Sequence, residues 1–268
     1  METRGPSPIS RKSTSIRRAL NRNSPHLQIG NRVLLMARYV SLGWGIRKER
    51  GGLWTRNAVR GKSVRGERRK RDGRVEWRKW DSHRSKVAAM LMRTKSDPST
   101  LIPEPGSLCV YLGASSGSTV SHLHDHICGA GNHHDGKIIA VDISSRMMRD
   151  LVIMCETRPG IIPVLADARH PLSVAQYLQR KSDWLFQDLS MPDQAKSFIE
   201  STSKLLTEGG LGIISIKAAS ERWAPGGDEQ HFDESESLIN SASHLQIIER
   251  IDLRGLEDQH IAIVTRKV

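Results

Sequence analysis

Short apolar runs alternate with amphipathic stretches along the chain from residue 108 onward. The apolar runs predict six strands, over residues 108–112, 137–141, 161–165, 184–186, 211–216 and 260–264. Between them, apolar residues recur every three or four positions, which predicts helices over residues 147–156 and 194–206. Strands that alternate with helices in this way predict an α/β fold, in which helices cover both faces of a mostly parallel sheet.

Residues 46–80 follow a different pattern, in which apolar and charged side chains alternate over short stretches. Val75 and Trp77 stand between charged residues, as on a strand with one buried face. Asp72 and Gly73 form a pair that is favoured in the turn of a β-hairpin. This region therefore predicts a small domain made of short strands.

A helix is expected directly after these strands, with Ser82 as its N-terminal cap. A proline-rich linker over residues 97–106 follows the helix. We therefore expect three parts. A basic, disordered extension covers residues 1–45, a small β-rich domain with a connecting helix covers residues 46–98, and a larger α/β domain covers residues 99–268.

The net charge of +12 is distributed unevenly over the 268 residues. Residues 1–95 contain 26 Lys and Arg but only 6 Asp and Glu. Residues 96–268 contain 15 Lys and Arg and 23 Asp and Glu. A basic region of this size indicates a nucleic-acid backbone as a partner. A solvated basic surface is the alternative interpretation.

The rest of the composition indicates a reduced compartment and no membrane partner. Cys109, Cys128 and Cys155 lack the spacing of a disulfide scaffold, which favours the cytoplasm. The longest early apolar run, residues 33–37, is far shorter than the roughly 20 residues that span a bilayer. Residues 1–30 are rich in Ser and Arg, which favours a disordered tail, with an organellar transit peptide as the alternative.

The stretch VYLGASSGST, residues 110–119, joins a predicted strand to a predicted helix and invites three interpretations. A dinucleotide site requires Gly-x-Gly-x-x-Gly, but Ser115 occupies the second glycine position. The hydrolase pattern Gly-x-Ser-x-Gly does fit, and it would make Ser115 a nucleophile with Asp188 and His260 as partners. That fold needs several strands before this turn, and the upstream region does not predict them.

The third interpretation is a site for S-adenosylmethionine, which has no phosphate groups and needs only close approach of the backbone. Asp142, Asp167 and Asp188 each follow a predicted strand, and the carboxyl ends of parallel strands form the ligand crevice of such a sheet. We expect Asp142 to accept the ribose hydroxyl groups and Asp167 to accept the adenine amino group. Helix capping is the alternative role for some of these carboxylates.

Several histidines invite a metal-site interpretation, which we weigh against an ordinary polar helix and loop. The candidate ligands are His122, His124, His126, His133, His134 and Cys128. On a helix, His122 and His126 share a face, but His124 does not. The chain also lacks paired cysteines with zinc spacing, so we predict no metal site.

A set of specific motifs runs from about residue 51 to the C-terminus. They are Thr55-Arg56-Asn57, Gly61-Lys62-Ser63-Val64, Arg84-Ser85-Lys86, the loop over residues 113–122, Arg149-Asp150-Leu151, Asp167-Ala168-Arg169-His170-Pro171, Pro192-Asp193-Gln194 and Ser215-Ile216-Lys217-Ala218. Together they resemble the fibrillarin family, including its archaeal fibrillarin-like members. The glycine- and arginine-rich tail of eukaryotic members is absent, which favours an archaeal type.

The resemblance implies a Rossmann-like S-adenosylmethionine-dependent methyltransferase that methylates ribose 2′-hydroxyl groups of rRNA and tRNA. It also implies that the protein acts within a box C/D ribonucleoprotein. The partners there would be guide and target RNA, a Nop-family scaffold protein and a kink-turn-binding protein. The compartment would be the cytoplasm for an archaeal-type protein and the nucleolus for a eukaryotic one. The alternative is a non-catalytic RNA-binding or assembly subunit that keeps a degenerate methyltransferase fold.

The resemblance also implies roles for individual residues. The family's catalytic set corresponds to Lys86, Asp188, Lys217 and His260. The residues implied to hold the cofactor are Gly113, Ala114, Ser118, Thr119, Asp142, Ile143, Asp167, Ala168, Asp188, Leu189, Ser190 and Met191.

The chain departs from the family pattern at several of these places. Asp142 replaces the usual glutamate, which shortens the reach toward the ribose by one methylene group. Met191 stands where a glutamine is usual, and residues 81–83 replace the usual Asn-Pro-Phe. The turn over residues 129–136 is longer than expected. These departures concern details of cofactor contact.

Overall fold

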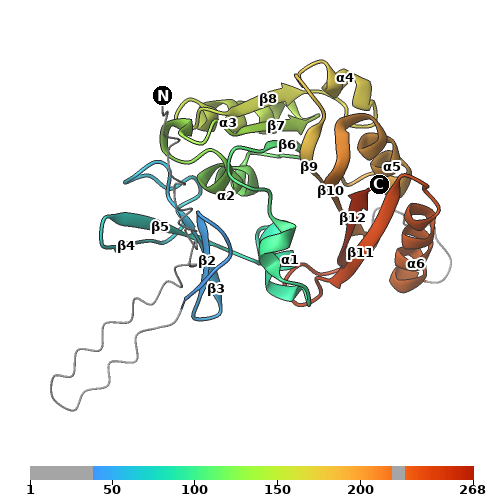
Figure 1. The fold of residues 1–268 in the computed structure, drawn as a ribbon, viewed down its shortest axis with the longest axis horizontal. Helices are drawn as coiled ribbons and strands as arrows, with labels where there is room; N and C mark the ends of the chain where they lie inside the picture. The colour runs from blue at the N-terminus through green and yellow to red at the C-terminus, as the bar shows by residue number, and fades with distance from the viewer. Residues whose placement is uncertain (1–38, 219–226) are drawn as a thin grey trace, which may run out of the picture. The chain divides into compact units, whose positions relative to one another are not determined.

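The computed structural model describes residues 39–218 and 227–268, which contain an N-terminal antiparallel sheet and a larger mixed sheet (Figure 1). The N-terminal strands are β1 (Val40–Ser41), β2 (Ile46–Glu49), β3 (Gly52–Arg56), β4 (Arg69–Asp72) and β5 (Val75–Trp80), in the order β1-β2-β3-β5-β4. The predicted hairpin is confirmed, because β4 and β5 pair directly and Gly73 takes a positive φ of 56° in the turn between them. Most of the predicted extension over residues 1–45 lies outside the described residues.

The two faces of the N-terminal sheet differ in what they contact. Glu76, Arg78 and Trp80 alternate along β5 and are buried, as a strand with one inward face requires. On the opposite face, the Arg47 guanidinium contacts two aromatic rings, 4.0 Å from the centroid of Trp77 and 4.9 Å from that of Tyr39. Cation–π contacts of this kind cover part of this second face.

Helix α1 (Lys86–Arg93) connects the two sheets, and its cap is Ser85 rather than Ser82. The Ser85 Oγ accepts the backbone N–H of Ala88 at 3.3 Å and also accepts the Trp80 indole N–H at 3.0 Å. The prediction that Ser82 caps this helix is therefore wrong. Ser82 lies within a turn in which the Arg84 N–H bonds the Asp81 carbonyl oxygen at 3.2 Å, so the helix cannot begin there.

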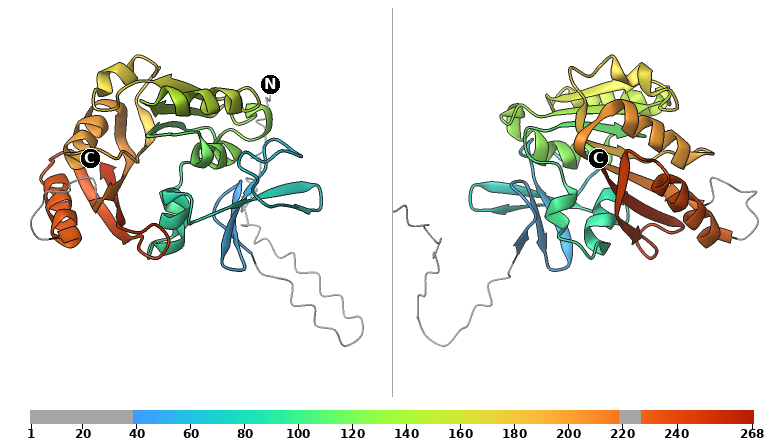
Figure 2. Two further views of the ribbon diagram at one scale, coloured as in Figure 1. Left: turned by 180° about the vertical axis from the view of Figure 1, so that it is seen from behind. Right: turned by 45° about the vertical axis from the view of Figure 1, so that its right-hand side comes forward.

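After the short 3₁₀ segment η1 (Pro98–Leu101), the chain forms the larger sheet, in the order β11-β12-β10-β9-β6-β7-β8 (Figures 1 and 2). Its elements are β6 (Leu108–Leu112), α2 (Ser118–Ile127), η2 (Ala130–Asn132), β7 (Lys137–Asp142), α3 (Ser145–Cys155), β8 (Ile161–Leu165), α4 (Pro171–Ala175), β9 (Ser182–Gln187), α5 (Gln194–Leu205), β10 (Leu206–Lys217), α6 (Gly227–Asn240), β11 (Leu245–Asp252) and β12 (His260–Lys267). Strands β6 to β10 run parallel, and β12 runs antiparallel to both of its neighbours.

All six predicted strands and both predicted helices of this region are present, which confirms the predicted α/β fold. The helices cover both faces. Residues of α1, α2 and α3 share one buried apolar cluster with the sheet, and residues of α4, α5 and α6 share the other. The domain boundary near residue 98 stays a prediction. Within the described ranges, no helix is long and apolar enough to cross a membrane.

Candidate active site

The carboxyl ends of the parallel strands meet at one edge of the larger sheet, where sequence analysis placed its candidate residues. Asp188 directly follows β9, and Lys217 ends the neighbouring β10. Because β12 is antiparallel, its first residue lies at this same edge, and His260 is the register partner of Lys217. The sheet topology thus brings Asp188, Lys217 and His260 to one edge, although Asp188 and His260 are 72 positions apart in the chain.

A cavity of about 480 Å³ opens at this edge. It is lined by Lys86, Gly113, Ser115, Val141, Asp142, Ile143, Ala166, Asp167, Ala168, Arg169, Asp188, Leu189, Ser190 and Met191. Most of the residues predicted to hold the cofactor therefore surround one space. The volume falls in the range of about 300–1,000 Å³ that is typical of small-molecule sites.

Three of the predicted cofactor residues do not line this cavity. Ala114 is buried under the loop. Ser118 and Thr119 begin helix α2, where the Thr119 hydroxyl donates to the Ser85 Oγ at 3.1 Å and Ser118 lines a separate cavity. The Thr119 hydroxyl thus joins α2 to the start of α1, and neither Ser118 nor Thr119 lines the active-site cavity.

Gly113 lets the loop after β6 lie directly against the end of β9. It has a φ of +87°, and a β-carbon at this position would stand 2.1 Å from the carbonyl oxygen of Asp188. The Gly113 and Ala114 N–H groups both donate to the Val141 carbonyl oxygen, at 2.9 and 2.8 Å. A side chain at residue 113 would therefore force the loop after β6 and the end of β9 apart.

Asp142 joins two loops at the cavity. One carboxylate oxygen accepts the Ser115 backbone N–H at 2.7 Å, and the other accepts the Ser144 N–H at 2.8 Å. An ionised carboxylate has about four acceptor positions, so two remain for a ligand with hydroxyl groups. The next carboxylate along, Asp167, forms hydrogen bonds to Arg169, and these lower its pKa.

The hydrolase interpretation of the loop does not agree with this geometry. Within the described residues, no hydrogen bond joins Ser115 to His260. Instead, the His260 Nδ1 donates to the Asp258 carbonyl oxygen at 2.6 Å. That bond directs the hydrogen to Nδ1 in the neutral ring and leaves Nε2 as a proton acceptor.

The four residues of the predicted catalytic set act on one another electrostatically. Lys86 Nζ lies 3.2 Å from a carboxylate oxygen of Asp188. Burial lowers the pKa of His260, and the charges of Lys86 and Lys217 lower it further. The hydrogen bond to Asp258 and the charge of Asp188 act in the opposite direction, but the pKa stays below its ordinary value. The side chain of His260 is therefore neutral in this setting and can accept a proton.

One acidic residue near this set was missed by sequence analysis. Glu257 lies in the turn between β11 and β12, and burial raises its pKa, while the nearby Lys86 lowers it and Asp188 raises it. A glutamate in a charged turn usually belongs to the solvated surface, so the sequence offered no signal.

The candidate metal ligands on α2 have other roles. His124 Nε2 donates to the Pro159 carbonyl oxygen at 3.0 Å, and His126 Nε2 donates to that of Pro103 at 2.9 Å. Burial lowers the pKa of each of these two imidazoles to about 4. His122 bonds the Thr55 hydroxyl at 2.8 Å. In the part of the chain that the structure describes, no group of three or more potential ligands could hold a metal ion.

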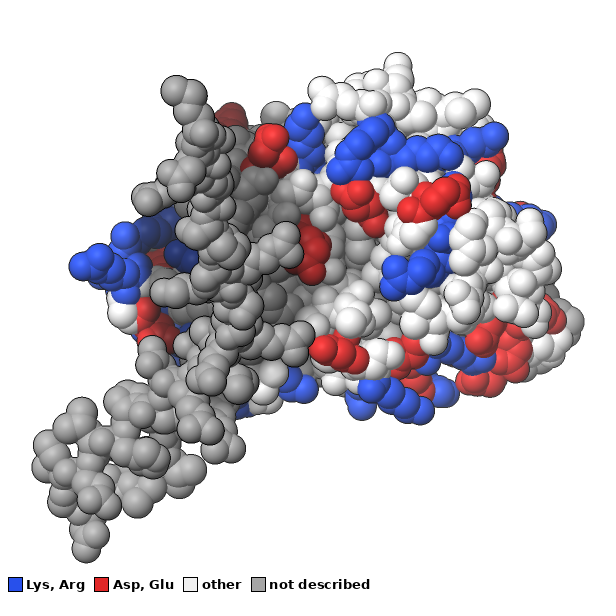
Figure 3. Space-filling view, in the orientation of Figure 1, with Lys and Arg blue, Asp and Glu red and all other residues white. Residues whose placement is uncertain are grey.

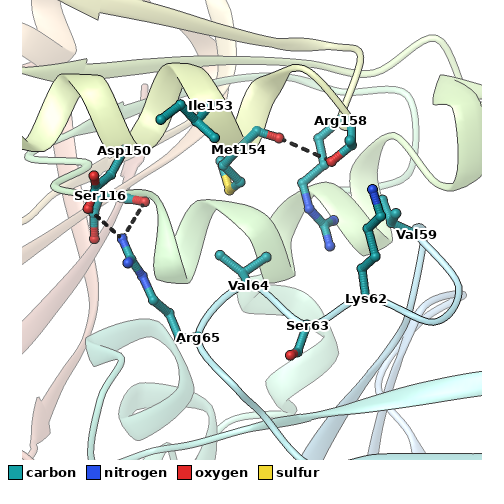
Figure 4. Close-up of a pocket in the computed structure, with 11 residues that line it drawn as sticks. Val59, Lys62, Ser63, Val64, Arg65, Ser116, Asp150, Ile153, Met154 and Arg158 are labelled. Atoms are coloured by element: carbon teal, nitrogen blue, oxygen red, sulfur yellow. Dashed lines mark hydrogen bonds and ion pairs between the residues drawn. The ribbon is translucent and has the colours of Figure 1, made fainter.

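The loop that precedes β4 in the N-terminal sheet also reaches the predicted cofactor loop. Arg65, in the loop before β4, donates to the Ser116 carbonyl oxygen at 3.1 Å and lies 3.5 Å from the Asp150 carboxylate of α3 (Figure 4). The same loop forms one side of a cavity of about 290 Å³ with Met154 and Arg158 on the other (Figure 4). The wall around the predicted cofactor loop thus includes residues from both parts of the chain.

The family model for fibrillarin matches residues 43–268. The chain belongs to the fibrillarin family. This fibrillarin is 37% identical over 213 residues to the fibrillarin-like rRNA/tRNA 2′-O-methyltransferase of Thermococcus sibiricus, which covers 80% of this chain and 89% of that protein. It is 38% identical over 218 residues to the rRNA 2′-O-methyltransferase fibrillarin of Encephalitozoon cuniculi, covering 80% of this chain and 71% of that protein.

Solved structures of fibrillarins share its architecture. The Methanococcus jannaschii fibrillarin pre-rRNA processing protein superposes with a TM-score of 0.75 at 29% identity, covering 86% of this fibrillarin and 97% of that chain. Aeropyrum pernix fibrillarin, solved with natively bound S-adenosyl-L-methionine, gives a TM-score of 0.71 at 28% identity over 86% and 100% of the chains. A fibrillarin/Nop5p complex gives 0.69 at 28% identity over 81% and 94%.

Proposed function

We propose that this fibrillarin is an S-adenosylmethionine-dependent RNA 2′-O-methyltransferase, acting on rRNA and tRNA. The single observation that carries the proposal is the meeting of Lys86, Asp188, Lys217 and His260 beside a cavity lined by the predicted cofactor residues. The names of its relatives support the reaction class, and the Aeropyrum pernix structure supports the cofactor.

The residues around the cavity fit this cofactor. Gly113 lets the loop after β6 pack directly against the backbone of Asp188, so that both segments line one wall of the cavity. Asp142 keeps free acceptor positions for the two ribose hydroxyl groups. S-adenosylmethionine supplies a methyl group on a positively charged sulfonium, which is already electrophilic.

The protein's own task is to prepare the ribose hydroxyl, which is a weak acid. His260 Nε2 accepts the proton of the 2′-hydroxyl group during attack, because its Nδ1 carries the hydrogen bonded to Asp258. The positive charges of Lys217 and Lys86 stabilise the negative charge that develops on the oxygen. Asp188 holds Lys86 in place through their 3.2 Å ion pair.

We further propose that the protein works within a box C/D ribonucleoprotein. The fibrillarin/Nop5p complex supports a Nop-family scaffold as one partner. Guide RNA would select the target nucleotide by base pairing, and a kink-turn-binding protein would join through the guide. The compartment is the cytoplasm for an archaeal-type protein and the nucleolus for a eukaryotic one.

The test is transfer of labelled methyl groups in a particle reconstituted with guide RNA and a complementary target. Lys217→Ala and Asp188→Ala should each remove most of the transfer, about 100-fold or more, because charge stabilisation and positioning are both lost. Ser115→Ala should change it little, because no covalent serine intermediate forms.

A target with a 2′-deoxyribose at the selected position serves as the substrate control and should accept no methyl group. If the wild-type particle assembles on guide and target but transfers nothing, the protein is an assembly subunit instead. If Ser115→Ala removes activity and Lys217→Ala does not, a serine nucleophile must be reconsidered.

A further inference from the structure

A second cavity, of about 540 Å³, lies beside the active-site cavity. Its walls come from the N-terminal domain, through Arg68 and Trp80, and from the starts of α1 and α2, through Ser85 and Ser118. Ser85 precedes Lys86 in the chain, and Ser118 closely follows Ser115, so each wall continues into the active-site cavity. Neighbouring residues of the same two segments, at the start of α1 and after β6, thus line the two cavities.

The charged side chains at this second cavity are mainly cationic. Arg68 and Arg84 are both exposed, and within the described residues neither forms an ion pair. The Glu67 carboxylate is committed elsewhere, because it accepts the Val64 and Arg65 N–H groups at 2.8 and 3.0 Å. The cavity therefore presents two guanidinium groups to solvent.

Neighbouring groups do little to offset this charge. Glu67 also pairs with the buried Arg78 at 3.2 Å. Burial holds the pKa of His122 well below its usual range, so its ring is neutral. Asp81 accepts the His83 N–H at 3.0 Å and remains as one carboxylate beside the two arginines. A ligand with negative charges is the kind that this surface fits.

We infer that the second cavity binds backbone phosphates of the RNA strand that carries the target ribose, with Arg68 and Arg84 as the phosphate contacts. The inference rests on the proposed function, because a ribose held beside Lys86 has a phosphate on each side along the strand. One flanking stretch of the strand then lies next to Ser85, which is the position of this cavity. Planar guanidinium groups bind phosphate oxygens in pairs of hydrogen bonds.

The wall of this cavity is held in place before RNA arrives. Glu67 anchors its own loop through two backbone N–H groups, and Arg65 ties the same loop to the carbonyl oxygen of Ser116 in the cofactor loop (Figure 4). A preformed phosphate site costs less ordering on binding than a mobile one. Position, as well as charge, therefore distinguishes this site from other basic surfaces.

The matched control is Arg74, which is also exposed and free of ion pairs in the described residues but lies at the turn of the β4–β5 hairpin, outside the cavity. Figure 3 shows Lys and Arg side chains gathered at that end of the hairpin. Arg68→Ala, Arg84→Ala and Arg74→Ala each remove one positive charge. Any difference among the three variants therefore shows the effect of where the arginine lies, because the change in charge is the same.

The experiment measures methyl transfer in the reconstituted particle at several concentrations of target RNA. Arg68→Ala and Arg84→Ala should each raise KM for the target roughly five- to tenfold and leave kcat near the wild-type value. Binding of S-adenosylmethionine, measured by calorimetric titration, should not change. Arg68→Lys and Arg84→Lys should recover part of the loss, and Arg74→Ala should behave as the wild type.

Direct binding of the free protein to single-stranded RNA provides a second measurement. The slope of log K against log salt concentration should fall by about 0.7 for each phosphate contact removed. If Arg68→Ala and Arg84→Ala match Arg74→Ala in both KM and slope, the inference is wrong. If they weaken assembly with the scaffold protein in the absence of target RNA, the cavity holds a protein segment and the inference is also wrong.

The same measurements distinguish an error in this inference from an error in the proposed function. Suppose that the proposed function is wrong. The wild-type particle would then transfer no methyl group, while the salt dependence of RNA binding would still separate Arg68→Ala and Arg84→Ala from Arg74→Ala. Thermal unfolding of each variant shows whether it remains folded. Because both arginines are exposed, their replacement should leave the unfolding temperature close to that of the wild type.

Discussion

At the scale of single residues, Asp142 combines a structural and a binding role. Replacing it with alanine removes its two backbone hydrogen bonds and the acceptors for the ribose, so Asp142→Ala should weaken S-adenosylmethionine binding by about 1–3 kcal/mol. Asp142→Glu, which restores the residue usual in the family, should keep most of the affinity. Calorimetric titration measures both, and unchanged affinity in the alanine variant would remove Asp142 from the cofactor site.

His260 should determine how activity depends on pH. Burial lowers its pKa below the ordinary value, so the neutral imidazole that accepts the proton persists as the pH falls through 6.5. We expect the acidic limb of kcat to lie below pH 6.5 and to disappear, with most of the activity, in His260→Ala. An acidic limb at or above pH 6.5 in the wild type would contradict this assignment.

At the scale of the element, the loop between β6 and α2 depends on Gly113. A β-carbon there would stand 2.1 Å from a backbone oxygen, which cannot move as a flexible side chain can. Gly113→Ala should therefore destabilise the protein by about 1–3 kcal/mol and weaken cofactor binding at least about tenfold.

Gly131 offers the control for this substitution, because it also has a positive φ, of 63°, but nothing lies within 4 Å of the place that a β-carbon would take. Gly131→Ala should cost about 1 kcal/mol through backbone strain and leave cofactor binding unchanged. Urea unfolding and calorimetric titration measure the two effects. Equal loss of affinity in both variants would show that close approach at residue 113 is unimportant.

At the scale of the whole molecule, one buried carboxylate joins the N-terminal sheet to the helices that pack on the larger sheet. Asp125 of α2 is fully buried and accepts hydrogen bonds from Arg78 at 2.8 Å, Arg158 at 2.7 Å and the Thr55 hydroxyl at 2.7 Å. Burial alone would raise its pKa, but Arg78 and Arg158 outweigh burial and hold the pKa well below the usual range.

Asp125→Asn should lower the free energy of unfolding by about 3–5 kcal/mol, because the buried Arg158 loses its counter-charge and the buried Arg78 keeps only its ion pair with Glu67. Asp150→Asn is the matched control, since its ion pair with Arg65 is exposed and should contribute less than about 1 kcal/mol. Chemical denaturation measures both. A small effect of Asp125→Asn would mean that water or other groups compensate the two arginines.

The sequence by itself determined the elements whose signal is local. The six predicted strands and two predicted helices are present because apolar periodicity reports burial directly, and the hairpin at Gly73 follows from turn chemistry that needs no distant partner. The motifs also identified the family, which the match over residues 43–268 confirms. Strand β11 was missed because it lies at the sheet edge, where most of its side chains are exposed or half-buried.

The tertiary structure decided what depends on neighbours distant in the chain. Ser85 rather than Ser82 caps α1 because the Trp80 indole and the start of α2 lie against it. The histidines of α2 bind backbone carbonyl oxygens, which periodicity could not distinguish from metal coordination. His260 reaches the edge where β10 ends only because β12 runs antiparallel, and strand direction is set by how the whole sheet packs.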